Sequence, residues 1–457
     1  RFKIVVLNFF DICNFKFWIF KTMSPLNIFS FPRAIVHIDG DCFFASCEVA
    51  RNPLLQGRPV VTGMERGIVS SLTYEAKARG VVRGMSLYEV KKVCPDVVLM
   101  PSDYETYSLY SVRMFDIVRR FTPAVEEYSI DECFADLTGL QRPMNMSYET
   151  MAKKIKETLD SELGMTFSVG LAPTKVLAKT ASKWKKPSGL TIITGHDIHL
   201  YLEKLSVEKV WGIGPQTTAF LRKCGVQTAL HFAQKSKEWV QERFTKPHYE
   251  IWQELRGLVV HELVTEPKTD YKSISKTKTF TPPSNEKDFV YSQLSKNVEN
   301  ACIKARRYKL ATKRIFFFLK SQDFRFYGFE LKLSRPSVAP TVILNALKEY
   351  FEKVFNYKIL YRATGVILTH LTEDANTQLD LFGQSLKAEK LNEIFGRTDE
   401  LARRYGKHTL FLGSSLLAMN NRQHEKDRGI LAERKTSLFV GETSRKRLGI
   451  PMLGAVV

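Results

Sequence analysis

The chain has 457 residues, a formal net charge of +20 at pH 7 and a calculated isoelectric point of about 9.5. Its hydrophobic content of 44% excludes a largely disordered protein and allows roughly two to four domains. A charge excess gathered on one face is typical of proteins that bind a phosphate backbone, although ribosome-associated or membrane-surface proteins also show it. The 7 cysteines form no CxxC pair and have no histidine at zinc spacing, which excludes common zinc-finger patterns and indicates a reducing, cytoplasmic setting.

Residues 1–30 are rich in aromatic side chains, but Lys16 and Lys21 interrupt them. The segment is too short and too interrupted for a membrane span, and it lacks the cleavage site of a signal peptide. The chain begins at Arg1, and Met23 stands shortly before the first expected strand. We therefore expect translation to start at Met23, and residues 1–32 to be an extension that is not native or is disordered.

From residue 33 onward, apolar runs of strand length alternate with segments of helical periodicity. Strands are expected at 34–38, 59–63, 68–72, 97–100, 124–129, 133–137, 167–172 and 190–193. Helices are expected at 42–51, 73–79, 86–93, 104–121, 147–163 and 174–185. This order predicts a helix-backed sheet, interrupted by a small insertion between its first strand and an acidic hairpin.

Two acidic motifs are the strongest candidates for chemistry. Asp39 ends the first apolar strand, and Asp131 and Glu132 stand between two strand-like runs. Neighbouring side chains on a regular strand point to opposite faces, so Asp131 and Glu132 can serve one site only if a hairpin lies there. Alternatively, Asp39 and Asp41 cap the following helix, and the second pair is a polar hairpin tip.

Three carboxylates on rigid strands suit a site for two magnesium ions. Mg²⁺ takes oxygen ligands and usually binds one or two carboxylates together with substrate phosphates. Two such ions can activate a hydroxyl and neutralise the leaving oxygen of a nucleoside triphosphate. The basic and hydroxylated residues that could face a triphosphate are Ser70, Ser71, Tyr74, Lys77 and Lys186. Taken alone, the last of these would be a solvated helix end.

Five motifs in order resemble those of Y-family DNA polymerases of the DinB type, also called DNA polymerase IV. They are IDGDCFFASCE, TYEAKARGV, SIDECFADL, VGLAPTKVLAKTASKWKKPSG and VWGIGPQT, and the resemblance covers about residues 33–415. It implies an α+β multidomain fold shaped like a right hand. The implied activity is template-directed DNA synthesis across damaged bases, with low fidelity and a mutator role in DNA repair and replication.

The resemblance also implies a division of the chain. The expected parts are the palm at 33–42 and 103–193, the fingers at 43–102, a thumb with a helix-hairpin-helix at 194–264, a linker at 265–271, the little finger at 272–372, and a tail at 373–457. The implied ligands are primer-template DNA, a dNTP and two Mg²⁺ ions per active site. We expect a monomer that does not associate with membranes.

Position by position, Asp39, Asp131 and Glu132 match the metal carboxylates of the family, and the main-chain carbonyl of Gly40 would add a ligand. The resemblance also implies that Phe43 and Phe44 bind the nucleotide. Phe44 matches the steric gate, an aromatic ring that leaves no space for a 2′-hydroxyl. Without the family, that ring would be assigned to core packing.

Tyr74 and Lys186 match positions that bind the triphosphate, and Ser71 stands where a hydroxyl commonly helps. Lys77 departs from the pattern, because the family usually has arginine there. Lysine keeps the charge but loses the planar fork, so its role could be shared with Arg79 or Arg83.

Two further regions would contact DNA. Gly212 and Gly214 lie in a motif that resembles a helix-hairpin-helix, where glycines let backbone amides approach a phosphate; the alternative is an ordinary Gly-rich connection. The little finger should contain strands at 272–280, 313–320, 326–333 and 362–371, with helices at 291–308 and 341–354. Its candidate phosphate contacts are Lys272, Lys276, Lys278, Arg314 and Arg335. Each alone could be a solvated strand position.

The segment QLDLF at 378–382 resembles the peptide that binds the bacterial sliding clamp. Leu381 and Phe382 would be the apolar anchors, and Gln378, followed by Leu379, would fix the register by hydrogen bonds. The alternative is a helix start. We expect a helix at 386–405 and a disordered basic tail, neither with an assigned role.

Two other functional classes remain open from the sequence. A catalytically inactive family member could bind DNA and the clamp as a scaffold, but it should lack the carboxylates, and all three are present. A nucleotidyl cyclase could use a similar palm, but it would not explain the helix-hairpin-helix, the basic C-terminal part or the clamp motif.

Overall fold

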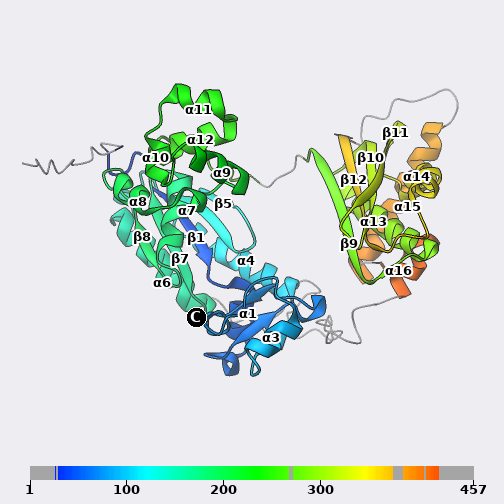
Figure 1. Cartoon of the computed structure of the whole chain (residues 1–457), viewed down its shortest axis with the longest axis horizontal. Helices are drawn as coiled ribbons and strands as arrows, with labels where there is room; N and C mark the ends of the chain where they lie inside the picture. The colour runs from blue at the N-terminus through cyan, green and yellow to red at the C-terminus, as the bar shows by residue number, and fades with distance from the viewer. Residues whose placement is uncertain (1–25, 27–28, 267–270, 374–383, 406–407, 421–457) are drawn as a thin grey trace, which may run out of the picture. The chain divides into compact units, whose positions relative to one another are not determined.

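The computed structural model describes residues 26, 29–266, 271–373, 384–405 and 408–420. The chain divides after Glu266 into two compact units, and this point lies inside the segment expected to be a linker (Figure 1). Within the described residues, no helix combines the length and apolar character that crossing a membrane would require.

The first unit is built on a five-stranded sheet with the order β5-β6-β1-β7-β8. Every residue of its central strand, β1, is buried, and β1 pairs antiparallel with both neighbours. The expected acidic hairpin forms, because β5 and β6 pair antiparallel. The strands are β1 (Ile35–Gly40), β5 (Val125–Glu127), β6 (Glu132–Asp136), β7 (Phe167–Ala172) and β8 (Leu190–Ile192).

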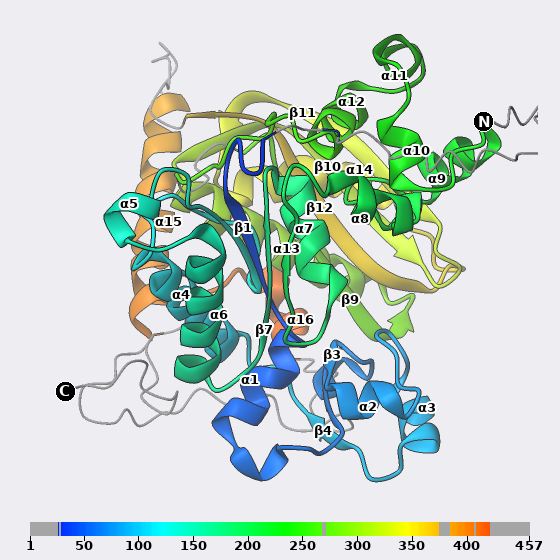
Figure 2. The ribbon, with the colours of Figure 1, turned by 90° about the vertical axis from the view of Figure 1, so that its left-hand side faces the viewer.

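Both faces of this sheet are covered, because alternate residues of β1 belong to different cores (Figure 2). Val36 and Ile38 pack with α4 and α6, whereas Ile35 packs with α7. At Gly170 of β7, an added Cβ atom would lie 2.2 Å from a backbone oxygen of α7, so only glycine allows this close approach. The helices are α4 (Tyr104–Arg119), α5 (Gln141–Met144), α6 (Tyr148–Leu163) and α7 (Lys175–Trp184).

The insertion between β1 and the hairpin has a small core of its own, which includes Val61 and Val90. Its sheet has the order β3-β2-β4. The expected strand at 68–72 is shorter in the structure, because Ile68 forms an isolated bridge with Ser86. The elements are α1 (Phe43–Arg51), η1 (Pro53–Leu55), β2 (Val60–Thr62), η2 (Met64–Arg66), β3 (Ser71–Leu72), α2 (Tyr74–Ala78), α3 (Leu87–Val93) and β4 (Val98–Met100).

Short helices follow β8 and share one core with α7, so the expected thumb packs directly on the sheet unit. The segment directly before the Gly-rich motif forms the 3₁₀ turn η3. The elements are α8 (Ile198–Lys204), η3 (Val207–Lys209), α9 (Pro215–Lys223), α10 (Ala229–Ala233), α11 (Lys237–Arg243) and α12 (Lys246–Leu255).

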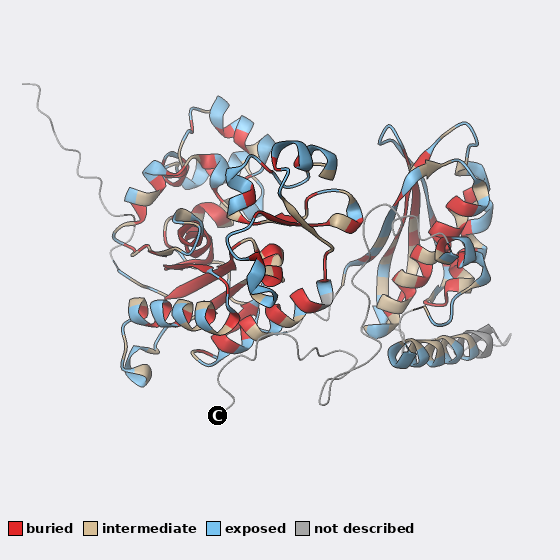
Figure 3. Ribbon diagram, turned by 90° about the horizontal axis from the view of Figure 1, so that it is seen from below, coloured by how far each residue is buried: buried red, intermediate tan, exposed pale blue. Residues whose placement is uncertain are grey.

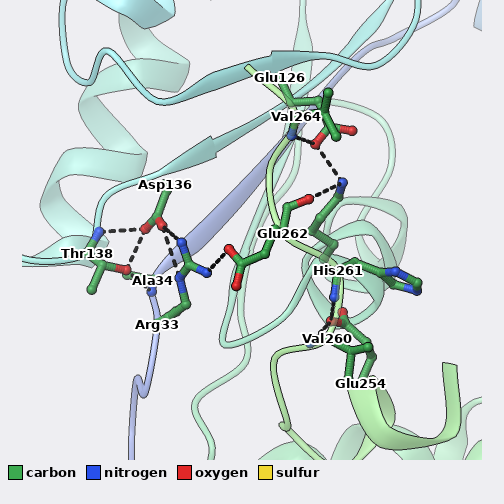
Figure 4. A network of polar contacts seen from close by, with 11 residues as sticks. Arg33, Ala34, Glu126, Asp136, Thr138, Glu254, Val260, His261, Glu262 and Val264 are labelled. Atoms are coloured by element: carbon green, nitrogen blue, oxygen red, sulfur yellow. Dashed lines mark hydrogen bonds and ion pairs between the residues drawn. The ribbon is translucent and has the colours of Figure 1, made fainter. Parts of the chain in front are cut away.

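Carboxylates hold the connector that leaves α12 against that helix and against the sheet (Figure 4). Glu254 is fully buried and accepts hydrogen bonds from the backbone N–H groups of Val260 and His261, both at 2.8 Å. Glu126 of β5 accepts from the Val264 N–H at 2.9 Å and pairs with Lys175 at 2.6 Å. Arg33 joins Asp136 to Glu262. The sheet therefore holds the connector as far as residue 264.

The second unit contains a four-stranded antiparallel sheet with the order β11-β10-β12-β9. Its core lies between one face of the sheet and the helices α13 and α14 (Figure 3). The strands and helices form where the sequence predicts them and are somewhat longer. They are β9 (Ser273–Ser284), α13 (Lys287–Arg307), β10 (Leu310–Ser321), β11 (Phe326–Ser337), α14 (Pro340–Val354) and β12 (Tyr361–Glu373).

Part of the tail is ordered, contrary to the sequence-based expectation of disorder. After α15 (Gln384–Tyr405), the chain forms η4 (Gly413–Ser415) and α16 (Leu416–Asn420), which pack on α13. Buried Glu299 of α13 accepts hydrogen bonds from the hydroxyl of Ser415 and, at 3.1 Å, from the N–H of Leu412. These contacts join distant residues, so local composition could not show them.

Candidate active site

The register of the central strands brings two of the acids together. In the antiparallel pair β1–β6, Asp39 stands directly opposite Glu132. Side chains that oppose each other in this way lie on the same face of the sheet, about 5 Å apart at Cβ. Asp39 is buried and Glu132 is half-buried at the end of the strands.

Asp131 occupies a bend just before β6 begins. Because it is not part of the strand, its side chain need not point to the face opposite that of Glu132. Its backbone carbonyl accepts a hydrogen bond from the N–H of Gly40 at 2.9 Å, which holds the bend against β1. Its carboxylate accepts a hydrogen bond from the hydroxyl of Ser129 at 2.5 Å. The distortion that the sequence required at this hairpin is therefore present.

The alternative role of the acids as helix caps is wrong. The N-cap residue of α1 is Cys42, and no side chain caps this end. Asp41 instead accepts hydrogen bonds from the hydroxyl of Ser168 at 2.8 Å and the N–H of Ser188 at 2.7 Å. It therefore joins β7 to the loop after α7, behind Asp39.

Lysines from the α7 region form ion pairs with two of the acids. Lys186 pairs with Asp39, and Lys179 pairs with Glu132. Their environments differ, since the side chain of Lys186 is 26% exposed and that of Lys179 only 6%. The Lys179 ammonium group also lies 5.1 Å from the ring centre of Trp211.

The ionisation of the acids follows from these partners. Burial raises the pKa of Asp39 to about 6, although the charge of Lys186 acts in the opposite direction. Burial also tends to raise the pKa of Glu132, but contacts with His37 and Lys179 outweigh it and leave the pKa at about 2. Because burial lowers the pKa of His37 to about 4, this histidine is neutral at pH 7. Lys179 is therefore the partner that keeps Glu132 ionised.

The residues fit magnesium chemically, but they do not converge in this structure. Asp39, Asp131, Glu132 and the carbonyl of Gly40 supply hard oxygen donors at adjoining strand ends. Across residues 29–266 and the rest of the described chain, no group of three or more acid, histidine or cysteine side chains lies close enough to hold a metal ion. Each acid contacts a protein donor instead, so binding ions requires the side chains to turn toward one another.

The proposed gate residue lies in a cluster of rings. The ring of Phe44 stacks on Tyr107 with centres 4.5 Å apart and an interplanar angle of 12°, and it meets Tyr104 edge-on at 5.5 Å. The hydroxyl of Tyr107 donates to Glu48 at 2.7 Å, which fixes the ring beneath. Phe43 is buried in the core, so Phe44 is the half-buried member of the pair.

The insertion brings its hydroxylated candidates to the start of α1. The hydroxyl of Ser71 donates to the Cys42 carbonyl at 3.2 Å. Burial raises the pKa of Tyr74, and the charges of Asp41 and Asp39 raise it further, so this ring lies near the acids. The Lys77 ammonium group lies 5.6 Å from the ring centre of Tyr74.

The two arginines that could share the role of Lys77 differ in their surroundings. Arg79 forms an ion pair with Asp96 away from the acids. The charge of Arg83, like that of Lys77, acts on the thiol of Cys42.

In the Gly-rich motif, Gly212 has a φ of +89°, and a Cβ atom there would lie 2.4 Å from the side chain of Ile251. Gly214 is the N-cap of α9 and has open space around its α-carbon. The Trp211 ring packs against the rings of Tyr128 and Phe134 at the β5–β6 hairpin, with centres 5.5 and 5.9 Å apart. The motif thus stands beside the acidic hairpin.

The basic candidates of the second unit do not share one face. Lys276 pairs with Val366 and Lys278 with Thr364, on the face that the helices cover. Burial lowers the pKa of Lys276, as do the charges of Lys304 and Arg307. Arg314 lies on the opposite face, paired with Lys332 and 3.6 Å from Glu330.

The remaining candidates are at the ends of strands or outside the structure. Lys272 is exposed just before β9, and Arg335 lies near the end of β11. The clamp-motif residues Gln378, Leu379, Leu381 and Phe382 lie outside the described residues.

Sequence reasoning missed the bridging role of Asp41 and the contacts of His37 and Lys179 with Glu132. A signal for the lysine was present, since Lys175, Lys179 and Lys183 recur every four residues along α7 and so share one face of the helix. The other two partners depend on long-range contacts, such as the 2.7 Å contact between His37 Nδ1 and the hydroxyl of Ser182.

Comparisons with known proteins cover most of the chain. A model of the impB/mucB/samB family matches residues 38–183, and a model of the C-terminal domain of that family matches residues 271–381. DNA polymerase IV of Bacillus velezensis is 30% identical over 404 residues, which covers 87% of this chain and 95% of that protein. DNA polymerase IV of Clostridium kluyveri is 29% identical, with 85% of this chain and 100% of that protein covered.

A solved structure of a Y-family DNA polymerase chimera, built from Dbh and Dpo4, has the same fold. The TM-score is 0.62 at 23% identity, and the match covers 74% of this chain and 99% of that chain.

Proposed function

The chain belongs to the Y family of DNA polymerases, in the DNA polymerase IV group, and from this premise we propose how its residues synthesise DNA across damaged templates. Asp39, Asp131 and Glu132, with the carbonyl of Gly40, bind two Mg²⁺ ions. When bound, these ions would neutralise charge on the attacking 3′-hydroxyl and on the leaving oxygen of the dNTP. The observation that carries this proposal is the β1–β6 register, which sets Asp39 opposite Glu132.

The two lysines have different roles in this proposal. Lys179 is buried and stays with Glu132, which keeps that acid ionised and in place. Lys186 is partly exposed and also lies 3.7 Å from Asp41, so it can leave Asp39 and turn toward a triphosphate. Tyr74 and Ser71 lie beside the same strand end, and Lys77 adds charge there.

Phe44 excludes ribonucleotides by occupying the space below the sugar. Its stacking on Tyr107 keeps the ring in one place, so a 2′-hydroxyl meets a fixed obstacle. We expect Phe44→Ala to raise the incorporation of ribonucleotides relative to deoxyribonucleotides, measured by single-nucleotide extension with each. Tyr88→Ala, at an exposed ring on α3, is the matched control. Unchanged sugar selectivity in Phe44→Ala would reject the gate.

The central test is primer extension with Mg²⁺ on undamaged and lesion-bearing templates. Asp131→Asn and Glu132→Gln each remove several kcal/mol of stabilisation of the developing charge, so we expect at least about 1,000-fold slower extension. DNA binding in gel-shift assays should be retained, because these acids are not phosphate contacts. Glu127→Gln, an exposed position on the same hairpin, is the control. Extension at the wild-type rate by a variant that carries both Asp131→Asn and Glu132→Gln would overturn the assignment.

Recruitment by the bacterial sliding clamp is a separate proposal, which rests on the QLDLF sequence at 378–382. Leu381→Ala with Phe382→Ala should abolish stimulation of synthesis by the clamp, because the two apolar anchors supply most of the binding. Basal extension without the clamp should not change. Stimulation that survives the double substitution would refute the role of this motif.

A further inference from the structure

The uncovered face of the second sheet carries a cluster of phenylalanines on β10 and β11. Ile315, Phe317 and Leu319 of β10 enter the core, so the residues between them point to the face without helices. On that face the ring centres of Phe318 and Phe326 lie 5.2 Å apart.

Two glycines leave space for the central ring. Phe318 is paired with Gly328 on one neighbouring strand and with Gly365 on the other. A Cβ atom at Gly365 would lie 2.3 Å from the Phe318 ring, and one at Gly328 would lie 3.1 Å from its Cβ. The ring can therefore extend over the strand beside it, which makes a shallow apolar floor.

The hairpin between β10 and β11 adds exposed rings to this floor. Phe324 is 59% exposed and Phe326 is 61% exposed. Phe324 has a φ of +67°, an uncommon backbone conformation for a bulky residue. Hydrogen bonds between Ser321 and Arg325 hold the turn, from the Ser321 N–H to the Arg325 carbonyl at 2.9 Å and from the Arg325 N–H to the Ser321 hydroxyl at 3.1 Å.

Two cations lie over these rings. The Arg362 guanidinium carbon is 4.3 Å from the ring centre of Phe324, and the Lys320 ammonium nitrogen is 4.8 and 4.7 Å from those of Phe324 and Phe326. A bulge in β12 lies between Tyr361 and Ala363 and includes Arg362. Across the described chain, neither Lys320 nor Arg362 forms an ion pair, and the nearby Asp323 pairs with Arg325 at 2.9 Å.

We propose that Phe318, Phe324 and Phe326, with Lys320 and Arg362, form a binding site for unpaired nucleotides of single-stranded DNA. A base would stack on the exposed rings while its phosphates meet the two cations, the combination that single-strand binders use. A purely apolar peptide would leave both cations without a partner. The inference rests on the proposed function, because a polymerase at work carries a template strand that is not yet paired.

The test uses the full chain and a short fluorescent oligothymidine, with anisotropy as the readout. Phe324→Ala with Phe326→Ala should weaken binding by about tenfold or more, the expected loss for one or two stacked bases. Binding of a blunt duplex should change by less than about twofold, because paired bases offer no free face to stack. Tyr357→Ala, at another exposed ring of the same unit, is the matched control.

A second pair of variants removes only the two positive charges, so a loss of DNA binding in them can be separated from a loss of folding. Lys320→Gln and Arg362→Gln should each reduce the slope of log affinity against log salt for the oligonucleotide by about 0.7. Unchanged oligothymidine affinity in the double phenylalanine variant, with a wild-type melting curve, would overturn the site and leave a protein partner as its occupant. Primer extension by the wild type is scored separately, so failure of the proposed function would be seen in that assay and not in this one.

Discussion

The two large sheets use their faces differently. The sheet of the first unit is covered on both faces, and its acids stand at strand ends, where lysines hold them. The sheet of the second unit is covered on one face only, and the other carries rings, hydroxyls and cations. A sheet packed on both faces has a fixed strand register and fixed side-chain positions, as an active site requires. A sheet with one open face instead offers a surface on which another molecule can bind.

The largest effect should come from breaking the buried pair of the first sheet. Lys179→Met leaves Glu132 without its ammonium partner, which should reduce the free energy of unfolding by about 3 kcal/mol or more at pH 7. Urea unfolding followed by tryptophan fluorescence measures this in the first unit, because residues 267–457 contain no tryptophan. Lys183→Met, at an exposed position on the same helix, is the control. A loss below about 1 kcal/mol would show that the pair is not buried in solution.

A matched pair of glycine substitutions compares the two sheets directly. Gly170→Ala would meet backbone atoms of α7 at 2.2 and 2.3 Å, which cannot move separately from the helix, so we expect a loss of about 3 kcal/mol. Gly365→Ala would meet only side-chain atoms, the Phe318 ring at 2.3 Å and the Thr277 hydroxyl at 2.9 Å, and both can turn aside, so about 1 kcal/mol is expected. Hydrogen exchange of each sheet measures both changes. Equal losses would contradict the distinction between the covered and open faces.

The stability of the second unit should depend on pH, with a smaller effect than those of the substitutions above. Burial raises the pKa of Glu299 above its ordinary value of 4.5, and this outweighs the hydrogen bonds from Ser415 and Leu412. The folded state therefore holds this proton more tightly than the unfolded state, and the unit loses stability as pH rises from 4.5 through the raised pKa. Glu299→Gln should remove this slope. Hydrogen exchange of α13 between pH 4 and 7 is the measurement, and an unchanged slope in the variant would assign it to another group.

The smallest effect concerns a single phosphate contact on the open face. Arg314→Gln should reduce the salt slope of duplex binding by about 0.9, with little change in stability. Lys276→Gln should change it less, because Lys276 lies on the helix-covered face. Gel shifts over a range of salt concentrations would measure both slopes. A larger change in slope for Lys276→Gln than for Arg314→Gln would place the DNA on the helix-covered face of the sheet.

The features that could be predicted from sequence are those that depend on nearby residues, such as apolar runs of strand length and turn residues. The buried run of β1 and the turn signals around Asp131 were sufficient to place the acids on strands and to expect the hairpin. The strand at 68–72 was predicted too long, because Ile68 forms only an isolated bridge there. The basic face of α7 could be seen in the sequence, but its pairing with the acids could not, since Lys179 and Glu132 are 47 positions apart.

The connector bound by Glu126 and Glu254 also determines where a mechanical force applied to the second unit would act in the first unit. Tension on the second unit would reach residue 264 and pass through Glu126 into β5, without first stretching the thumb helices. Since β5 is one arm of the hairpin that bears Asp131 and Glu132, a pull of this kind would act on the acids of the proposed metal site.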